Sequence, residues 1–237
     1  MVQPLVPRWA PGSFLARLPA EQCAGLLSLG VVRQFEAGRR LLREGDLSTH
    51  VELVLRGFVK ITNVVDGTEV LMAIRMPGDL LGELAALTGN PRIATATACG
   101  RVVSSVLTGA EFHRFMRRYP DAALNMAAAM GDRLQWSNER RTDFAAYPAE
   151  VRLARLLVEI ARKCGRRTEE GISIGIALSQ PELATMVGVS EATVQKAFKE
   201  LRGNGVLRTG YRRISVLDLP ALRAYGAGAD DWPTMTG

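Results

Sequence analysis

Residues 178–201 read LSQPELATMVGVSEATVQKAFKEL, and this stretch decides the fold of the second half of the chain. Ser179 and Glu182 stand at the ends of an S-x-x-E capping box that has a proline in its first turn. Gly188 follows, where a sharp turn needs a residue that tolerates positive φ. Ser190 can then cap a second helix, whose apolar residues recur at helical spacing. A helix, a glycine-containing turn and a second helix together predict a helix-turn-helix motif.

A small β-hairpin, or wing, is predicted directly after this motif, with strands near residues 206–207 and 214–216. Six basic residues and one acidic residue lie between Lys196 and Arg213, so this segment carries a formal charge of +5. The whole part after Pro148, with 13 basic and 10 acidic residues, carries only +3. Such a local concentration of positive charge favours a nucleic-acid contact. The alternative is an ordinary helical hairpin with a solvated charged face.

Residues 120–144 predict one long helix that joins two different halves of the chain. Pro120 and Asp121 suit a first helical turn, because that turn needs no amide donor at its start and favours a carboxylate. One set of residues recurs at steps of four and three: Ala123, Ala127, Met130, Leu134, Ser137, Arg141 and Phe144. This heptad spacing predicts a seam between two identical chains, although Arg141 fits it only through an interchain pair. The alternative is one amphipathic helix that packs on its own domain.

Before this helix the sequence predicts a β-rich domain. Residues 31–107 contain many short runs with alternating polarity and glycine-containing turns, and Asp66-Gly67 is a strong hairpin signal. Such a pattern is typical of a β-sandwich, barrel or roll. Helices are predicted over 12–29, 110–119 and 149–164, a loop over 165–171 and a strand over 172–178. The fold class is therefore α+β.

Composition limits the function classes. The chain has 237 residues, 47% hydrophobic content, 23% charged content and a net charge of +6, and no apolar run long enough to span a membrane. Three isolated cysteines predict a reducing, cytoplasmic compartment, and the proline-containing first twelve residues do not predict a secretory signal. No metal-site, Walker A or nucleophile-elbow motif occurs, so we expect neither an enzyme nor an obligatory cofactor.

Three segments in the first half complete a second group of motifs: Pro77-Gly78-Asp79, Gly82-Glu83-Leu84-Ala85 and Pro91-Arg92-Ile93-Ala94-Thr95-Ala96. They resemble the phosphate-binding cassette of cyclic-nucleotide-binding β-rolls. Together with the helix-turn-helix, they make the region 31–217 similar to the catabolite-activator-like (CRP/FNR) bacterial transcription regulators. This resemblance implies a sensor β-roll, a long dimerisation helix and a C-terminal winged helix-turn-helix.

The resemblance also implies an effector site formed by Gly82, Glu83, Leu84, Arg92, Ile93, Ser137 and Asn138. A glycine lets backbone amides approach an anion, a carboxylate can accept from a ribose hydroxyl, and an arginine can pair with a phosphate. Ile93 departs from the pattern, since cyclic-AMP-responsive bacterial members usually have a hydroxyl residue there. The effector is therefore either a cyclic nucleotide, cyclic AMP or cyclic GMP, or a different or missing ligand. The alternative role for Arg92 is a surface arginine paired with Glu83.

The expected DNA-contacting residues are Ser179, Ser190, Glu191, Ala192, Thr193, Gln195, Lys196, Lys199, Arg208 and Arg212. Glu191, Gln195 and Lys196 suit contacts with cytosine, adenine and guanine, respectively. Thr193, Lys199, Arg208 and Arg212 suit phosphates. In catabolite activators the exposed face commonly reads arginine, glutamate and arginine. Here Glu191, Ala192 and Lys196 stand at those positions, so we expect a different base preference.

These observations predict a dimeric regulator that binds a symmetric site in double-stranded DNA and has RNA polymerase as a further partner. We expect a sensor domain over 1–119, the dimerisation helix and hinge over 120–147, a DNA-binding domain over 148–225 and a flexible tail over 226–237. One alternative is a family member that binds DNA constitutively, with a β-roll that senses nothing or holds another ligand. The other is a nucleotide-sensing module whose C-terminal domain binds protein.

Overall fold

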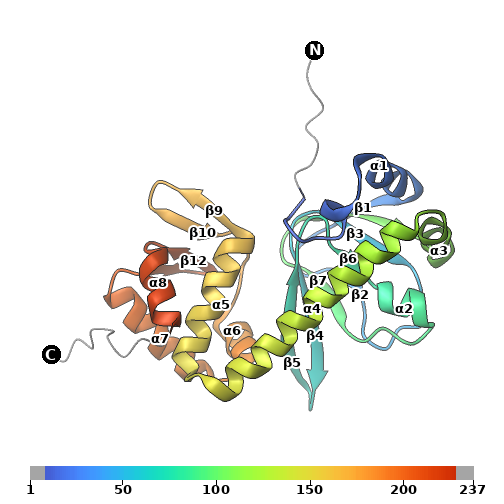
Figure 1. Cartoon of the computed structure of the whole chain (residues 1–237). Helices are drawn as coiled ribbons and strands as arrows, with labels where there is room; N and C mark the ends of the chain where they lie inside the picture. The colour runs from blue at the N-terminus through green and yellow to red at the C-terminus, as the bar shows by residue number, and fades with distance from the viewer. Residues whose placement is uncertain (1–8, 228–237) are drawn as a thin grey trace. The chain divides into compact units, whose positions relative to one another are not determined.

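The computed structural model describes residues 9–227, which belong to two compact units, Met1–Gln135 and Trp136–Gly237 (Figure 1). The boundary falls inside one helix, α4 (Pro120–Ala146), which supplies residues to both units. Each unit has its own sheets and core and is described separately below. The domain boundaries expected from the sequence stay predictions. From residue 228 on, the expected tail lies outside the described residues.

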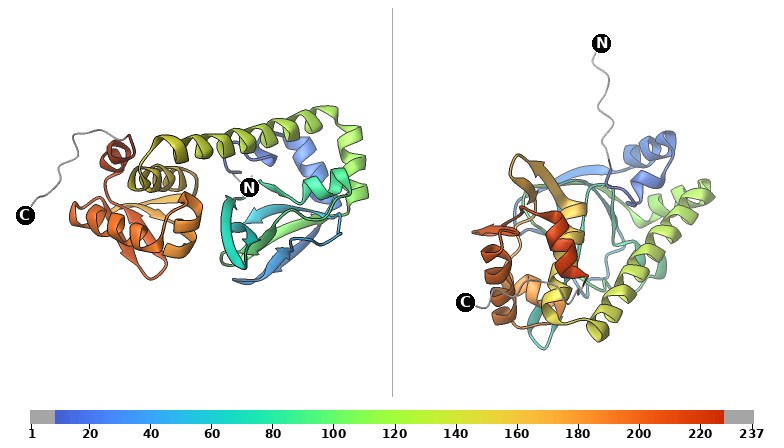
Figure 2. Two further views of the ribbon diagram at one scale, coloured as in Figure 1. Left: turned by 90° about the horizontal axis from the view of Figure 1, so that it is seen from below. Right: turned by 60° about the vertical axis from the view of Figure 1, so that its left-hand side comes forward.

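The strands of the N-terminal unit, which Figure 2 shows from two further sides, form two four-stranded antiparallel sheets. Their strand orders are β1-β8-β3-β6 and β2-β7-β4-β5. Their bounds are β1 Val31–Phe35, β2 Arg40–Leu42, β3 Val51–Arg56, β4 Val59–Val65, β5 Thr68–Arg75, β6 Leu80–Leu81, β7 Thr95–Ala98 and β8 Val102–Leu107. This arrangement confirms the predicted β-roll. At the turn between β4 and β5, Asp66 and Gly67 have φ angles of 50° and 78°, as a two-residue hairpin of this type requires.

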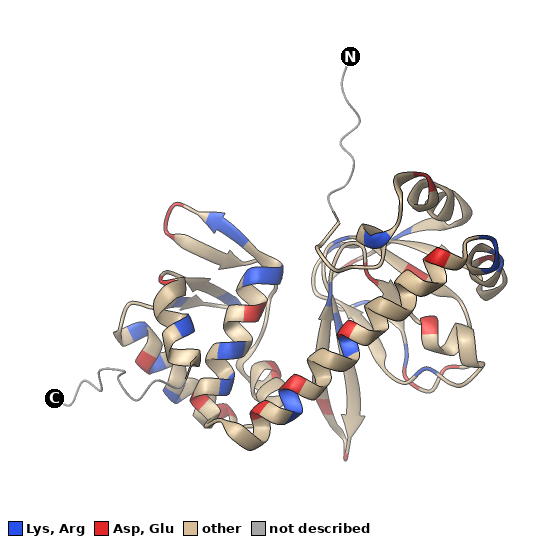
Figure 3. Ribbon diagram, in the orientation of Figure 1, with Lys and Arg blue, Asp and Glu red and all other residues tan. Residues whose placement is uncertain are grey.

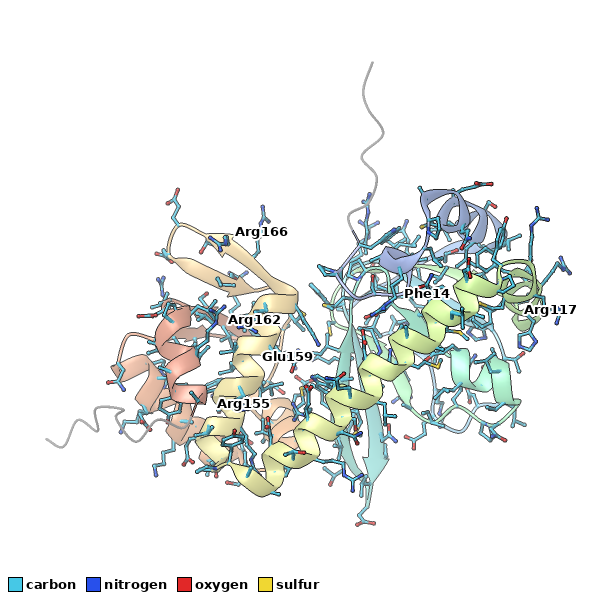
Figure 4. All side chains as sticks on the ribbon, viewed as in Figure 1. Phe14, Arg117, Arg155, Glu159, Arg162 and Arg166 are labelled. Carbon is cyan, nitrogen blue, oxygen red and sulfur yellow. The ribbon has the colours of Figure 1, made fainter. Side chains whose placement is uncertain are left out.

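Helices cover one face of this roll. They are η1 (Leu15–Arg17), α1 (Ala20–Leu29), α2 (Glu83–Thr88), α3 (Gly109–Arg118) and the first part of α4. One core lies between η1, α1, α3, α4 and the sheet that contains β3, and it includes Phe14, labelled in Figure 4. A second core joins residues of both sheets. The residues of β3 from Val51 to Val54 are consequently all buried, because one face of this strand meets helices and the other meets the second sheet.

The C-terminal unit contains a four-stranded antiparallel sheet ordered β11-β12-β10-β9, together with helices. Beyond α4 its elements are α5 Ala149–Cys164, β9 Gly165–Thr168, β10 Gly171–Ile174, α6 Gln180–Val187, α7 Glu191–Gly203, β11 Leu207–Gly210, β12 Arg213–Val216 and α8 Leu219–Gly226. The predicted helix-turn-helix is α6 and α7, and the predicted wing is β11 and β12. Both predictions are confirmed.

Two details of the prediction for this unit are wrong. Residues 165–171 were expected to form a loop, but β9 pairs with β10 from Gly165 to Thr168. Its exposed polar side chains, including Arg166 (Figure 4), gave no apolar alternation, and only the backbone ladder makes this segment a strand. The strand expected over 172–178 ends at Ile174. Ile176 and Leu178 are apolar because they are buried in the core, and they belong to no ladder.

Helix α8 was not predicted, although its start carries a visible signal. Asp218 is the N-cap, and its Oδ1 accepts a hydrogen bond of 2.8 Å from the backbone N–H of Ala221. Pro220 stands in the first turn, where no backbone donor is needed. Leu222 is fully buried, so this helix completes the core of the C-terminal unit.

Candidate functional site

A pocket of about 450 Å3 opens in the N-terminal unit beside the start of α2. Its size falls in the range of small-molecule sites. The structure brings five of the expected effector residues to this pocket: Gly82, Glu83, Leu84, Arg92 and Ile93. The first part of α4 closes one side with Met130, Arg133 and Leu134. These residues, distant in sequence, therefore surround one concave site, while their role toward a ligand stays a prediction.

Arg92 is a buried residue of this site, and its side chain is held by the protein on several sides. It is only 4% exposed. Nη1 donates to the Gly82 carbonyl at 2.7 Å, Nη2 to the His50 carbonyl at 2.5 Å, and Nε to Ser48 Oγ at 3.3 Å. The alternative of a surface arginine paired with Glu83 is therefore wrong.

Gly82 has a structural role that differs from the one expected. Its φ is +80°, and a Cβ built there would lie 2.2 Å from Nη1 of Arg92. The missing side chain thus makes room for the guanidinium group of Arg92. Any larger residue at position 82 would displace this arginine, so the glycine and the arginine form one structural unit.

A buried carboxylate on β3 acts electrostatically on Arg92. Glu52, which is 1% exposed, accepts a hydrogen bond of 2.6 Å from Ser104 Oγ. Burial lowers the pKa of Arg92, and the charges of Glu52, Glu83 and Asp46 oppose that shift. Glu52 therefore helps to keep the buried arginine charged. The sequence analysis assigned no role to Glu52, which lies in one of the short runs over residues 31–107.

The free donors and acceptors in the pocket fit a phosphorylated ligand. A guanidinium group has five N–H donors, so the three bonds of Arg92 leave two N–H groups for a phosphate. Glu83 Oε1 accepts from Arg133 Nη1 at 2.6 Å, and a carboxylate retains further lone pairs for a ribose hydroxyl. The pocket thus offers a donor group for an anion and an acceptor group for a sugar.

Arg133 is a pocket residue that sequence reasoning missed. Besides Glu83, it binds the carbonyl of Leu80 at 2.8 Å through Nη2 and lies 3.9 Å from Asp79 Oδ1. The signal was present, because Ala122, Met126, Ala129 and Arg133 recur at helical spacing. The first three are the buried residues of α4, so Arg133 continues the face that packs on the roll.

Ile93 and the two expected effector residues on α4 are exposed. Ile93 is 64% exposed at the pocket, and its carbonyl accepts a hydrogen bond of 3.0 Å from Asn63 Nδ2. Ser137 and Asn138 are exposed residues of α4 beyond Gln135, in the other unit, and they do not line this pocket. Their contact with an effector stays a prediction.

In the C-terminal unit, capping interactions fix both helices of the helix-turn-helix. Ser179 and Glu182 form a reciprocal capping box at the start of α6. Gly188 ends α6 with φ of 62°, and Ser190 Oγ accepts from the Thr193 N–H at 3.2 Å to start α7. The hydroxyls of Ser190 and Thr193 also lie 2.9 Å apart. The turn that was expected from the sequence is therefore built as expected.

Helix α7 separates an apolar face from a polar one. Val194, Ala197, Phe198 and Leu201 are buried at helical spacing. The exposed residues of α7 on the other side include Glu191, Ala192, Gln195, Lys196 and Lys199. Gln195 Nε2 donates to Glu191 Oε1 at 3.4 Å, a long bond that a base edge could replace. The exposed side thus carries both acceptors and donors.

The wing adds further cations beside α7. Arg208 Nη2 lies 2.8 Å from Glu170 Oε2 in an exposed ion pair, and such pairs contribute little to stability. Arg212, at φ of 51°, stacks its guanidinium group 5.8 Å from the ring centroid of Tyr211. Elsewhere basic and acidic residues intersperse along α4 and α5 (Figure 3). The cations of α7 and the wing, and not the net charge of the chain, therefore distinguish this surface from the rest of the C-terminal unit.

Two family models match the chain. Residues 32–119 match the cyclic nucleotide-binding domain, and residues 151–225 match the Crp-like helix-turn-helix domain. These ranges coincide with the β-roll and with the unit that contains α6, α7 and the wing. None of the helices in the described part of the chain is long and apolar enough to cross a membrane.

Curated relatives and solved structures agree with these matches. The CRP-like cAMP-activated global transcriptional regulator of Mycobacterium tuberculosis is 27% identical, over 78% of this chain and 83% of that protein. The cyclic AMP receptor protein of Thermus thermophilus is 27% identical, over 83% and 88%. The crystal structure of a CRP/FNR-family regulator from the same organism matches with a TM-score of 0.70 and 26% identity, over 83% of this chain and 98% of that one.

The fold, the two matched domains and the relatives define a class, that of DNA-binding transcription regulators with a cyclic-nucleotide-binding-type sensor domain. It is a class of regulators and not of enzymes. Within it, the chain belongs to the CRP/FNR family.

Proposed function

We propose that this protein is a homodimeric transcription regulator in which a small effector, bound in the pocket of the β-roll, controls binding to a two-fold symmetric DNA site. The observation that carries this proposal is the position of α4 in the chain. Its first part supplies Met130, Arg133 and Leu134 to the pocket, and its last part belongs to the DNA-binding unit. A ligand that engages the pocket therefore acts directly on the helix that leads to the DNA-binding domain.

The dimer proposal is supported by an apolar stripe on α4 that nothing covers within the described chain. Leu124 is 69% exposed and Leu134 is 63% exposed, and Ala127 is exposed between them. A second copy of α4 would remove this surface from water. Phe144 supports the seam less than expected, because its ring already packs against Gly188. Arg141 is exposed, and its interchain pair stays a prediction.

The Glu83–Arg133 ion pair is the proposed switch. Both residues line the pocket, and Arg133 belongs to α4. A ribose hydroxyl that donates to Glu83 competes with Arg133 for the same carboxylate. It thereby alters the Glu83–Arg133 interaction and shifts the preferred position of α4. An effector can shift such an equilibrium only by its difference in affinity for the two states. This contact supplies such a difference.

The effector we propose is a cyclic nucleotide, cyclic AMP or cyclic GMP. The free N–H groups of Arg92 and the remaining acceptors of Glu83 support this choice. Ile93 replaces a hydroxyl that commonly binds the phosphate in cyclic-AMP-responsive members, so affinity should be modest. The proposal places the protein in the cytoplasm, with RNA polymerase as its partner on DNA.

For DNA recognition we propose that Glu191, Gln195 and Lys196 read base edges from α7. Ser179, Ser190, Thr193, Lys199, Arg208 and Arg212 are proposed phosphate-side contacts, and Ala192 leaves room for a base. The exposure of the polar face of α7 supports this division. Two such helices in a dimer would enter successive major grooves, about 34 Å apart.

Lys196→Ala and Lys199→Ala should have different effects on DNA binding, although each removes one exposed lysine from α7. Loss of a base contact should cost about 1–3 kcal/mol on the selected site and relax one base position. Loss of a phosphate contact should weaken all sequences alike and reduce the salt slope by about one. Selection from a random duplex library, followed by salt titration, measures both quantities.

The two variants serve as matched controls for each other, because charge and exposure are the same. Identical selected sequences and identical salt slopes for both variants would contradict the division of roles. If Glu191→Ala and Gln195→Ala also select the same consensus sequence as the unmodified protein, α7 does not determine the base sequence that is bound.

A further inference from the structure

The pocket contains a cation that forms no ion pair with a described residue. Arg75, the last residue of β5, lines the pocket and is partly buried. Among the described residues its guanidinium group makes neither a hydrogen bond nor an ion pair. The two nearby carboxylates are committed elsewhere: Asp79 Oδ2 accepts from the Met76 N–H at 2.8 Å, and Glu83 binds Arg133 at 2.6 Å.

The charges that line the pocket are unbalanced. Among the described residues that line it, three are arginines, Arg75, Arg92 and Arg133, and one is a carboxylate, Glu83, so these four carry a formal charge of +2. Burial, and then the positive charge of Arg133, lower the pKa of Arg75 to about 10. One cyclic phosphate supplies a single negative charge, so it leaves part of this cationic lining without a partner.

Arg75 and Arg92 have different neighbours in the pocket. The backbone N–H of Met76, the residue after Arg75, donates to Asp79 Oδ2 at 2.8 Å, and Asp79 Oδ1 lies 3.9 Å from Arg133 Nη2. Arg92 instead donates to Ser48, Gly82 and His50. Glu83, the residue after Gly82, binds Arg133 at 2.6 Å and so connects the two groups. A ligand whose phosphate binds Arg92 and whose sugar binds Glu83 therefore places its base beside Arg75.

We infer that Arg75 determines the base specificity of the effector pocket and selects a purine with acceptors at both N7 and O6, as in a guanine cyclic nucleotide, over adenine. This inference rests on the proposed cyclic-nucleotide function. A guanidinium fork donates two parallel hydrogen bonds, and guanine presents two acceptors, N7 and O6, that match it. Adenine presents a donor amino group next to N7, which cannot accept the second bond.

Calorimetry on the full-length protein tests this inference with cyclic GMP, cyclic AMP and cyclic IMP, which retains N7 and O6 but lacks the 2-amino group. We expect the unmodified protein to bind cyclic GMP and cyclic IMP about tenfold more tightly than cyclic AMP. Arg75→Leu should bring the three affinities to within about twofold. Arg56→Leu, which removes an exposed arginine outside the pocket, should keep the original preference.

Retained binding of cyclic AMP by Arg75→Leu shows that this variant is folded. Equal affinities in the unmodified protein, a preference for cyclic AMP, or a guanine preference that persists in Arg75→Leu would overturn the role of Arg75 and leave the proposed function standing. Binding of none of the three nucleotides by the unmodified protein would overturn both.

Discussion

Arg92→Leu is expected to lower the free energy of unfolding of the N-terminal unit by about 3 kcal/mol, because it removes a buried side chain that donates to two backbone carbonyls. The carbonyls of Gly82 and His50 lose their donors, and buried acceptors without partners are costly. Glu52, at 1% exposure, loses a neighbouring positive charge. Hydrogen exchange at the amides of β3 and β8 measures this loss in the unit concerned.

The matched control is Arg39→Leu, which removes an exposed arginine from the same unit. Such a change should alter stability by no more than about 0.5 kcal/mol. If the amides of β3 and β8 are equally protected from exchange in both variants, the buried hydrogen bonds of Arg92 contribute nothing measurable to stability. Arg92 then has no structural role. Loss of nucleotide binding without loss of protection would assign Arg92 to the ligand alone.

Gly188→Val is expected to destabilise the helix-turn-helix by about 3 kcal/mol and so to reduce DNA binding strongly. Gly188 has φ of +62°, which β-branched residues adopt at high cost. A Cβ there would also lie 2.6 Å from Cε1 of Phe144, a ring that Arg152 covers at 5.0 Å from its centroid. Urea unfolding monitored by hydrogen exchange in α6 and α7 measures this effect.

Gly203→Val provides the control, because Gly203 is exposed at the end of α7 and a Cβ there meets nothing within 4 Å. Valine is slightly better than glycine in a helix, so stability should change by less than about 0.5 kcal/mol. Equal stability of the two variants would mean that neither the turn geometry nor the Phe144 contact at Gly188 matters.

Local signals explain which parts of the fold the sequence could predict. Capping boxes, the Asp66-Gly67 turn and helical spacing are read from a few neighbouring residues, and each of these predictions is confirmed. Strand β9 failed because its side chains are polar and exposed, so only its pairing with β10 identifies it. Helix α8 carried the Asp218 cap as a readable signal that was overlooked.

The candidate site shows the same division. Gly82, Glu83 and Arg92 stand in a recognisable segment, so the sequence could bring them together. The partners that define their chemistry are distant in the chain: Arg133 is 50 residues from Glu83, and His50 is 42 from Arg92. Arg75 ends an unremarkable strand, and only the pocket lining shows that it lacks an ion-pair partner in the described part of the chain.

The central claim is that an effector in the β-roll controls DNA binding, and one titration tests it most directly. Fluorescence anisotropy should follow the binding of the full-length protein to its selected symmetric duplex at fixed salt, with and without cyclic GMP or cyclic AMP. The account predicts that a nucleotide shown by calorimetry to bind raises the DNA affinity about tenfold or more, which is a coupling within the usual range. Equal DNA affinity with and without the bound nucleotide would contradict the account and favour a regulator that binds DNA constitutively.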